Sequence, residues 1–336
     1  MTMFQPRSIF LLLVFLIGFS ACSDDDPVQI THYYNPVWTP DGKTVVAGIW
    51  QYLDSGSDAV TGPWIDPGTL AVYDMETESQ SVITLPVGTV HRLYSFDPSG
   101  MALAFVEDAI GFYSLDGSEL LRYSPSAGGT PMHLAFNNTG NSFVWTGATA
   151  NEYTVNTTQY NSTGWSIEDE STLFSIPRES PMIALELTSQ RSVALRFADG
   201  VVREYDFDGA LLNTFTTTPF DTENPWQQRL MLYSLNGIRL LYFRDGSGLH
   251  RFDLESGESR QLVKGAVVDM DVLASRATMV YETGTGDVWI ATTDASPLTR
   301  IAPQNLMPRF SPAGNGIAMV ARTTPQRDTL NVLLLR

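Results

Sequence analysis

The chain of 336 residues contains a single cysteine, Cys22, and only four histidines. One cysteine cannot form an intramolecular disulfide, and it cannot supply the paired thiolates of a cysteine-based metal site. No two of the histidines stand at a metal-ligand spacing such as H-E-x-x-H; they are His32, His91, His133 and His250. We therefore expect no metal site, and we expect the histidines to be loop or packing residues.

Basic residues are also scarce. The chain has 20 lysines and arginines against 37 aspartates and glutamates, which gives a net charge of −17. A strongly negative surface repels the phosphates of DNA and RNA. The composition therefore excludes a nucleic-acid partner.

The sequence motifs of several enzyme classes are missing as well. There is no G-x-S-x-G nucleophile elbow, no phosphate-binding P-loop and no G-x-G-x-x-G dinucleotide motif. The acidic segment Asp54–Asp58 lacks the third carboxylate and the closing glutamate of a calcium loop. The sequence predicts no cofactor and no catalytic residue, although carboxylates from distant segments could still meet in space.

The N-terminus has the features of a targeting segment. Arg7 is followed by the apolar run Ile9–Phe19, which is too short to span a bilayer comfortably. Small residues then precede Cys22, an arrangement that resembles a bacterial lipobox, with Phe19 in place of the usual aliphatic residue. The alternative is a cleaved secretory signal with an incidental cysteine. We expect residues 1–21 to be a lipoprotein signal peptide and Cys22 to carry a diacylglyceryl group that anchors the protein in a membrane.

The residues after Cys22 form an acidic tether, residues 22–27. Ser23 at the next position does not resemble the aspartate signal for retention in the inner membrane, and the run Ser23–Asp26 resembles the export signal of surface lipoproteins in Bacteroidota. The alternative reading of this run is a solvated spacer. The resemblance implies an outer-membrane location, on the periplasmic face or at the cell surface.

A segment of about ten residues recurs seven times after the tether. Each copy has an apolar residue, a short polar turn and an apolar strand, as in WTPDGKTVVA, and the starts are separated by 38 to 58 residues. The copies begin at Trp38, Phe96, Phe136, Leu187, Tyr233, Val272 and Phe310. Turns such as Pro-Asp-Gly reverse the chain between two strands, and an apolar run suits a strand that is covered on both faces.

Each copy is followed by a second hairpin, for instance Leu70–Asp74 with Gln80–Thr84, so that each repeat supplies four strands. Periods near 40 to 45 residues with four strands each are typical of propeller blades. The pattern resembles the TolB-like, PD40-type WD40 propeller repeat, and its best matches are Trp38–Lys43 and Phe310–Pro312. We therefore predict an all-β, seven-bladed β-propeller with four-stranded antiparallel blades over residues 28–336.

The last copy has room for only three strands before the chain ends. The segment Val28–Thr31, just before the first blade, resembles the fourth-strand endings of other repeats. We predict that Val28–Thr31 pairs with the last blade as its outer strand and closes the ring.

Two interruptions of the repeat are candidates for function. The insertion Trp50–Gly68 lies between the second and third strands of the first blade, and residues 216–228 join two blades; in this fold both loops share one face. Their aromatic residues are Trp50, Tyr52, Trp64, Phe220 and Trp226. Exposed aromatics on loops over a rigid scaffold mark binding surfaces. The alternatives are that they plug the central channel or cap a blade edge.

A third irregular stretch, Tyr160–Ser171, is expected to join the outer strands of the third blade on the opposite face. Taken together, these features favour a lipid-anchored, non-catalytic propeller that binds a protein or other macromolecular partner at the cell envelope. An alternative is a hydrolase or lyase with its site at the central axis. A third possibility is an assembly role in a surface complex.

Overall fold

The structure of the chain is a computed structural model. It describes residues 28–54, 68–85, 94–106, 108–137, 141–189, 191–216, 230–235, 238–296, 298–324 and 327–335. These residues form 27 β-strands and one short 3-10 helix. Within the described ranges, no helix combines the length and the apolar character needed to cross a bilayer. The predicted all-β class is confirmed.

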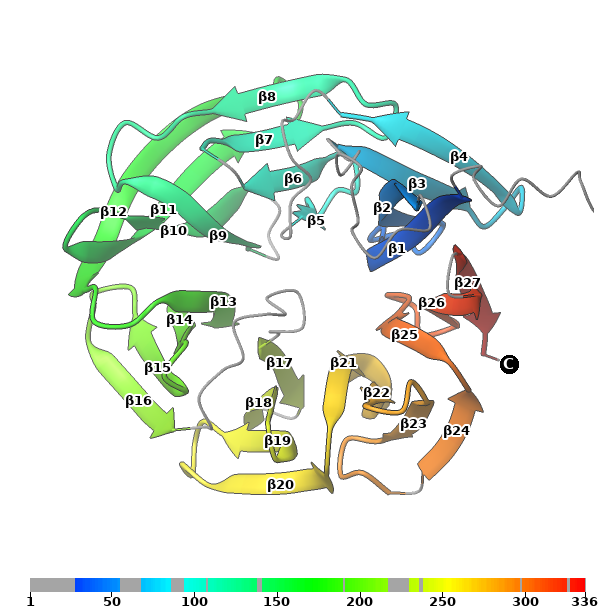
Figure 1. Cartoon of the computed structure of the whole chain (residues 1–336). Helices are drawn as coiled ribbons and strands as arrows, with labels where there is room; N and C mark the ends of the chain where they lie inside the picture. The colour runs from blue at the N-terminus through cyan, green and yellow to red at the C-terminus, as the bar shows by residue number, and fades with distance from the viewer. Residues whose placement is uncertain are drawn as a thin grey trace, which may run out of the picture.

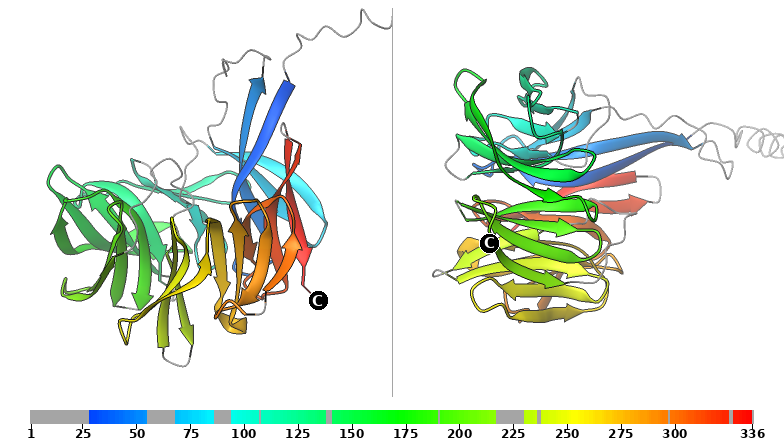
Figure 2. Two further views of the ribbon diagram at one scale, coloured as in Figure 1. Left: turned by 60° about the horizontal axis from the view of Figure 1, so that its bottom comes forward. Right: turned by 90° about the vertical axis from the view of Figure 1, so that its left-hand side faces the viewer.

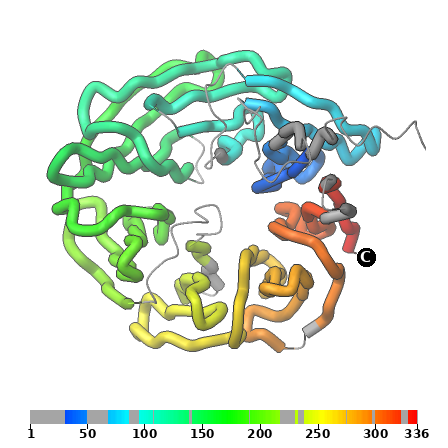
Figure 3. The backbone as a smooth tube through the Cα atoms, viewed as in Figure 1, coloured from blue at the N-terminus to red at the C-terminus, as the bar shows by residue number. Residues whose placement is uncertain are grey.

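The strands form seven antiparallel blades in a ring around a central axis (Figures 1 and 3). Blade 1 contains β1 (Val28–Trp38), β2 (Thr44–Asp54), β3 (Thr69–Asp74) and β4 (Ser79–Thr84). Blade 2 contains β5 (Tyr94–Phe96), β6 (Leu103–Val106), β7 (Ile110–Tyr113) and β8 (Glu119–Tyr123). Blade 3 contains β9 (Thr130–Phe136), β10 (Ser142–Ala148), β11 (Glu152–Asn161) and β12 (Ser166–Pro177). Blade 4 contains β13 (Met182–Ser189), β14 (Ser192–Phe197), β15 (Val201–Asp206) and β16 (Leu211–Thr216).

The remaining blades follow in chain order. Blade 5 contains β17 (Leu230–Leu235), β18 (Ile238–Asp245), β19 (Gly248–Asp253) and β20 (Ser259–Lys264). Blade 6 contains β21 (Val267–Leu273), β22 (Thr278–Thr283), β23 (Val288–Thr292) and β24 (Leu298–Ala302). Blade 7 contains β25 (Asn305–Phe310), β26 (Gly316–Thr324) and β27 (Arg327–Leu334), and β1 joins its sheet beside β27. The predicted seven-bladed propeller is confirmed.

The repeated segment forms the turn between the innermost and the second strand of each blade. In the described turns that keep glycine, this residue has a positive φ, at Gly42 (70°), Gly100 (74°) and Gly314 (69°), a conformation that glycine adopts without steric cost. Successive turns also approach each other: a Cβ at Gly100 would lie 3.1 Å from Cδ of Pro40 in the preceding blade. The turns therefore form a ring on one face of the propeller, which we call the turn face.

The core consists of separate clusters, one at each junction between neighbouring blades among the described residues. The second strand of a blade explains this arrangement. In β6, Leu103 and Phe105 pack toward blade 1, while Ala104 packs toward blade 3. Because successive side chains of a strand point to opposite faces, an unbroken apolar run serves both junctions at once.

The ring closes between blades 7 and 1. The core cluster at this junction contains Trp38, Val45 and Leu330, and Trp38 Nε1 donates a hydrogen bond to the carbonyl of Arg309 at 3.0 Å. The N-terminal strand does pair with the last blade, as predicted, but only through one parallel pair, Thr31 with Arg327.

The prediction for Val28–Thr31 was wrong in one respect. This segment is not a separate outer strand. It is the beginning of β1, and it pairs antiparallel with β2, starting with Val28 opposite Asp54. The reason is that the chain runs without interruption from Val28 to Trp38, and the long β2 offers it a partner along this whole length.

The ends of β1 and β2 form a two-stranded ribbon, residues 28–32 and 50–54, that extends past the other blades (Figure 2). β3 pairs with β2 only as far as Gly48, so the ribbon has no third strand from β3. The ribbon lies at the end of the blade opposite the turn at residues 39–43. The insertion does lie between the second and third strands, and its first five residues belong to β2.

The stretch Tyr160–Ser171 lies between the third and fourth strands of blade 3, as expected, but it is more regular than its sequence suggested. β11 continues to Asn161 and β12 begins at Ser166. Trp165 in the short turn stacks on Tyr160, with ring centroids 6.2 Å apart, and contacts Phe112 of blade 2. Aromatic packing across the blade junction therefore fixes this hairpin.

Candidate functional site

A cavity of about 900 Å³ lies on the propeller axis beside the turn face. Its walls come from the ends of the innermost strands of blades 1 to 5 and from the turn of blade 7. Most of the lining residues are apolar, and they include Phe96, Leu134, Phe136, Leu185 and Leu187. The volume of this cavity lies in the range of small-molecule sites.

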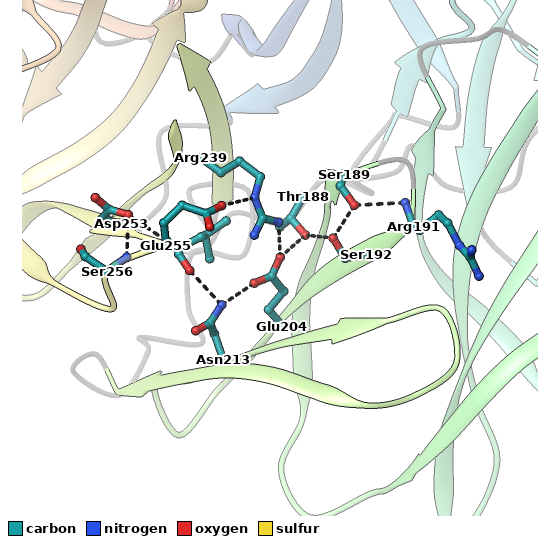
Figure 4. Close-up of polar contacts among 11 residues, drawn as sticks. Thr188, Ser189, Arg191, Ser192, Glu204, Asn213, Arg239, Asp253, Glu255 and Ser256 are labelled. Atoms are coloured by element: carbon teal, nitrogen blue, oxygen red, sulfur yellow. Dashed lines mark hydrogen bonds and ion pairs between the residues drawn. The ribbon is translucent and has the colours of Figure 1, made fainter. Parts of the chain in front are cut away.

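The polar side of this axial cavity is formed by blades 4 and 5, where a hydrogen-bonded network surrounds the buried carboxylate of Glu204 (Figure 4). Thr188 Oγ1 donates to Glu204 at 2.6 Å, Asn213 Nδ2 donates at 2.6 Å, and Arg239 Nη1 donates at 2.9 Å. Glu204 is fully buried, and a buried charge is stable only when such partners replace water. Thr188 and Arg239 also line the cavity.

Arg239 links this network to solvent. Its Nε donates to the exposed carboxylate of Glu255 at 2.8 Å, and its side chain is 25% exposed. Partial burial alone would lower the pKa of Arg239, but the hydrogen bonds and negative charges of Glu255 and Glu204 raise it. The guanidinium is therefore held as a cation between two carboxylates from neighbouring blades.

The sequence did contain a signal for this network that our reading missed. Arg239 is the seventh residue of its repeat copy, and the other full-length copies carry small residues there: Thr44, Ala102, Ser142, Thr278 and Gly316. In the copy that begins at Leu187, which is one residue short, Ser192 is the matching residue. In blade 4 the turn has lost its proline and glycine, and the hydroxyl of Thr188 donates a hydrogen bond to Glu204. In blade 1 the hydroxyl of the corresponding Thr39 accepts a hydrogen bond from Thr44 N of the same turn. A departure from the repeat thus marked the polar site.

A second group of buried charges lies between blades 6 and 7. Arg309 Nη2 is 2.7 Å from Asp269 Oδ2, and Asp271 accepts a hydrogen bond from the backbone of Phe310 at 2.7 Å. Glu282 accepts from Met307 N at 2.9 Å. Burial raises the pKa of Glu282 to about 7, and the nearby Asp269 adds to this effect. All three carboxylates belong to blade 6, on β21 and β22, and their partners belong to β25 of blade 7. These contacts therefore connect the two blades.

The histidines that the structure describes lie against neighbouring residues of the blades. His32 contacts Asp328 at 2.9 Å across the junction of blades 1 and 7. His133 is buried, which lowers its pKa to about 4. His250 contacts Asp245 at 3.0 Å. His91 lies outside the described residues.

The predicted binding residues are described only in part. The backbones of Trp50 and Tyr52 belong to the ribbon, opposite His32 and Ile30, respectively. The side chains of these two residues lie outside the described part of the structure, as do Trp64, Phe220, Trp226 and the lipidation residue Cys22 entirely. Their role in binding stays a prediction.

The same described ranges hold no metal centre built from histidine, cysteine, aspartate or glutamate side chains. Within them, no three or more of these side chains are grouped so that they could hold a metal ion. Of the acidic segment Asp54–Asp58, only Asp54 is described.

Comparisons with known proteins agree with the fold. No protein-family model matches the chain, and no curated protein matches it in sequence. Among the many solved structures that match, three do so over 91–92% of the chain at 12% sequence identity. They are an oligogalacturonate lyase in complex with manganese (TM-score 0.59, 91% of that chain), the C-terminal WD40 domain of Sif2 (0.53, 82%) and U3-55K (0.61, 98%).

At this identity the three structures show the fold alone, because one fold supports unrelated functions. They agree with the WD40-like architecture predicted from the repeat. The chain is therefore similar to WD40-type and enzymatic β-propellers in its architecture, and its function has to be argued from its own residues.

Proposed function

We propose that this protein is a lipid-anchored, non-catalytic propeller of the TolB-like type that binds a protein or other macromolecular partner at the outer membrane. The lipobox-like residues before Cys22 and the acidic tether support the anchor. The partner-binding face would be the one that carries the ribbon, opposite the turn face.

The observation that carries the proposal is the ribbon itself. β1 and β2 extend past the blades in an arm that pairs with β27 only at Thr31, and two-stranded arms are marginally stable in water unless something packs on them. The arm contains Trp50 and Tyr52 at alternate positions of β2. Aromatic residues supply much of the binding energy in protein interfaces, so the arm is well suited to contact a partner.

The anchor can be tested by replacing Cys22 with alanine. We expect the variant to lose incorporation of radiolabelled palmitate completely and to move from the membrane fraction to the soluble fraction, because the acyl chains supply the membrane affinity. The measurement is labelling followed by fractionation of the bacterial envelope. Continued membrane association of the unlabelled variant would contradict lipid anchoring.

The binding face can be tested with the double variant Trp50→Ala/Tyr52→Ala. We expect the amount of a co-purified partner to fall at least tenfold, since removal of one central aromatic anchor commonly costs more than about 1.4 kcal/mol. The measurement is affinity purification from solubilised envelope, followed by quantitative mass spectrometry. The same experiment with Trp64→Ala/Trp226→Ala tests the predicted loops.

The matched control is Val82→Ala on β4, where an apolar side chain is 58% exposed on the outer strand of the same blade. This variant should retain the partner. Thermal unfolding of each variant separates loss of binding from loss of structure. An unchanged set of co-purified proteins for both double variants would show that the partner binds elsewhere.

A further inference from the structure

Blade 7 has one strand fewer than the other blades. It contains β25, β26 and β27, whereas blades 1 to 6 each have four strands of their own. β1 follows β27 in the sheet but pairs with it only through Thr31 and Arg327. In the part of the chain that the structure describes, no strand pairs with the outer edge of β27 beyond this point (Figure 1).

The backbone groups along this open edge follow from the register of β27 with β26. Leu335 N donates a hydrogen bond to Asn315 O at 2.8 Å, in the register that continues along both strands. Hydrogen-bonded and non-hydrogen-bonded pairs alternate along an antiparallel ladder, so the odd-numbered residues of β27 bond to β26. The N–H and C=O groups of Leu330, Val332 and Leu334 therefore point away from β26, toward the open edge.

A groove of about 440 Å³ follows this edge, and we call it the edge groove. Its lining includes Leu330 and Val332, which pack toward blade 1, and Leu333, which packs toward blade 6. Tyr73 of β3 and Ile301 of β24 supply walls from these two neighbouring blades. The edge groove thus lies at the position where blades 1 to 6 hold their fourth strand.

The core clusters show what this position lacks. Each of the other six junction clusters includes an apolar side chain from the fourth strand of the preceding blade, such as Ile83 of β4 or Phe215 of β16. The cluster between blades 7 and 1 includes Leu330 and Val332, but no fourth-strand side chain among the described residues. An apolar side chain on an added strand would complete this cluster.

The edge groove also contains a buried polar atom without a partner. Asn305, at the start of β25, lines the groove and is 7% exposed. Its Nδ2 donates to Pro303 O at 2.7 Å, but its Oδ1 has no hydrogen-bond partner among the described residues. Buried polar atoms in proteins are normally hydrogen-bonded. A donor on an occupant of the groove would therefore satisfy this oxygen.

The size and charge of the edge groove favour a single extended segment. Nine described residues line it, whereas a stable interface between folded proteins uses about 20–30 residues on each side. None of the nine is charged, and the chain as a whole carries −17, so acidic side chains are disfavoured there. β27 is also recessed between the outer strands of its neighbours, which keeps β27 of a second copy away.

We propose that an extended segment of a protein partner adds to β27 as the fourth strand of blade 7, with apolar residues at alternate positions and no acidic residues. Its residues opposite Leu330 and Val332 face blade 1 and direct their N–H groups at β27, because paired residues of an antiparallel ladder share one face. In blade 1, Ile83 has this arrangement: it lies opposite Leu70 and packs toward blade 2. The inference goes beyond the proposed function, because it concerns a different surface from the ribbon.

The test uses the purified full-length protein and the peptide acetyl-Lys-Val-Thr-Val-Thr-Lys-amide, in which valine and threonine occupy opposite faces of a strand. Two further peptides carry N-methyl groups, one on both valines and the other on both threonines. We expect the threonine-methylated peptide to keep its affinity and the valine-methylated peptide to bind at least about tenfold more weakly, because only the latter loses the donors that face β27. The measurement is titration followed by the amide NMR signals of Leu330, Val332 and Leu334.

Val332→Pro tests the protein side of the interaction. Proline lacks the N–H that points to the open edge, and no hydrogen bond to β26 is lost, so the variant should fold but bind the peptide at least about tenfold more weakly. The matched control is Val82→Pro on β4, whose N–H also points away from its neighbouring strand, and peptide binding should be unchanged. Thermal unfolding shows whether both variants remain folded. The methylated peptides act on the native protein, so they decide the question even if a proline variant unfolds.

Equal affinity of the two methylated peptides, no binding at millimolar concentrations, or unchanged binding to Val332→Pro would each overturn the proposal. A native dimer that Val332→Pro abolishes would also overturn it, because the occupant would be a second copy. So would slow hydrogen exchange of the Leu330 and Val332 amides without peptide, because the chain itself would then fill the groove. The ribbon variants leave this titration unchanged, so the two proposals can fail separately.

Discussion

Replacement of Asp269 with asparagine should lower the free energy of unfolding by about 3–5 kcal/mol, the usual cost of leaving one member of a buried ion pair without its partner. Asp269 Oδ2 lies 2.7 Å from Arg309 Nη2, and the two side chains are 2% and 4% exposed. Asparagine has the size of aspartate but carries no charge, so the buried guanidinium of Arg309 would lose the carboxylate with which it is paired. The pair connects β21 to β25, so its loss weakens the junction of blades 6 and 7.

The measurement is urea denaturation at neutral pH, and the matched control is Asp287→Asn. Asp287 also pairs with an arginine, Arg300 at 2.6 Å, but both side chains are partly exposed. Exposed pairs contribute about 0–1 kcal/mol because water and salt screen them. If Asp269→Asn proved as mild as Asp287→Asn, the Asp269–Arg309 pair would not stabilise the ring.

A second outcome separates charge from packing. The double variant Asp269→Asn/Arg309→Met removes both charges and leaves a methionine that fills part of the space of the arginine. We expect it to be more stable than Asp269→Asn alone, because no unpaired charge stays buried. A double variant that is less stable than either single variant would indicate that the arginine acts through packing and through its hydrogen bond to the carbonyl of Pro308.

The architecture could be predicted from the sequence because its physical cause is local and repeated. Four copies end an innermost strand at their first apolar residue, as at Trp38 and Phe310, and in the other three the strand ends one or two residues later. The following turn depends on residues that are adjacent in sequence. The apolar run of the second strand then reveals that both its faces are covered. Seven copies of one pattern therefore predicted seven blades.

Ring closure was harder to predict because it depends on a choice between two partners that are distant in sequence. Val28–Thr31 has the character of a strand, and both β27 and the extended end of β2 were available to it. Strand character alone does not select a partner, since register and pairing are set by tertiary contacts. The sequence could show that this segment pairs with a strand of the last blade, but not that most of its residues pair with β2.

The polar site on the turn face was missed for a related reason. Glu204 and Arg239 are 35 residues apart and belong to different blades, so no spacing rule connects them. What the sequence could show was the exception: an arginine at a repeat position that is otherwise small. The interrupted repeats drew attention to the loops with Trp64 and Trp226, while the fold placed the axial cavity beside the regular turns.

Replacement of Glu282 with glutamine should increase the free energy of unfolding by about 3 kcal/mol above pH 8 and should have little effect below pH 4.5. Burial raises the pKa of Glu282 from 4.5 to about 7 in the folded protein, and each unit of difference corresponds to about 1.4 kcal/mol. The folded state thus holds the proton more tightly than the unfolded state. The stabilisation that comes from this bound proton is complete below pH 4.5 and is lost as the pH rises through 7.

Glutamine removes this dependence because it cannot ionise, and its side-chain oxygen can still accept the hydrogen bond from Met307 N, which is 2.9 Å in the native protein. The measurement is the difference in denaturation free energy between the variant and the native chain at several pH values, so that the other titrating groups cancel. Glu258→Gln on an exposed turn of blade 5 is the control and should give a small difference at every pH. If the variant were less stable than the native protein above pH 8, the carboxylate would be stabilised as an anion by Arg309, and the raised pKa of Glu282 would be wrong.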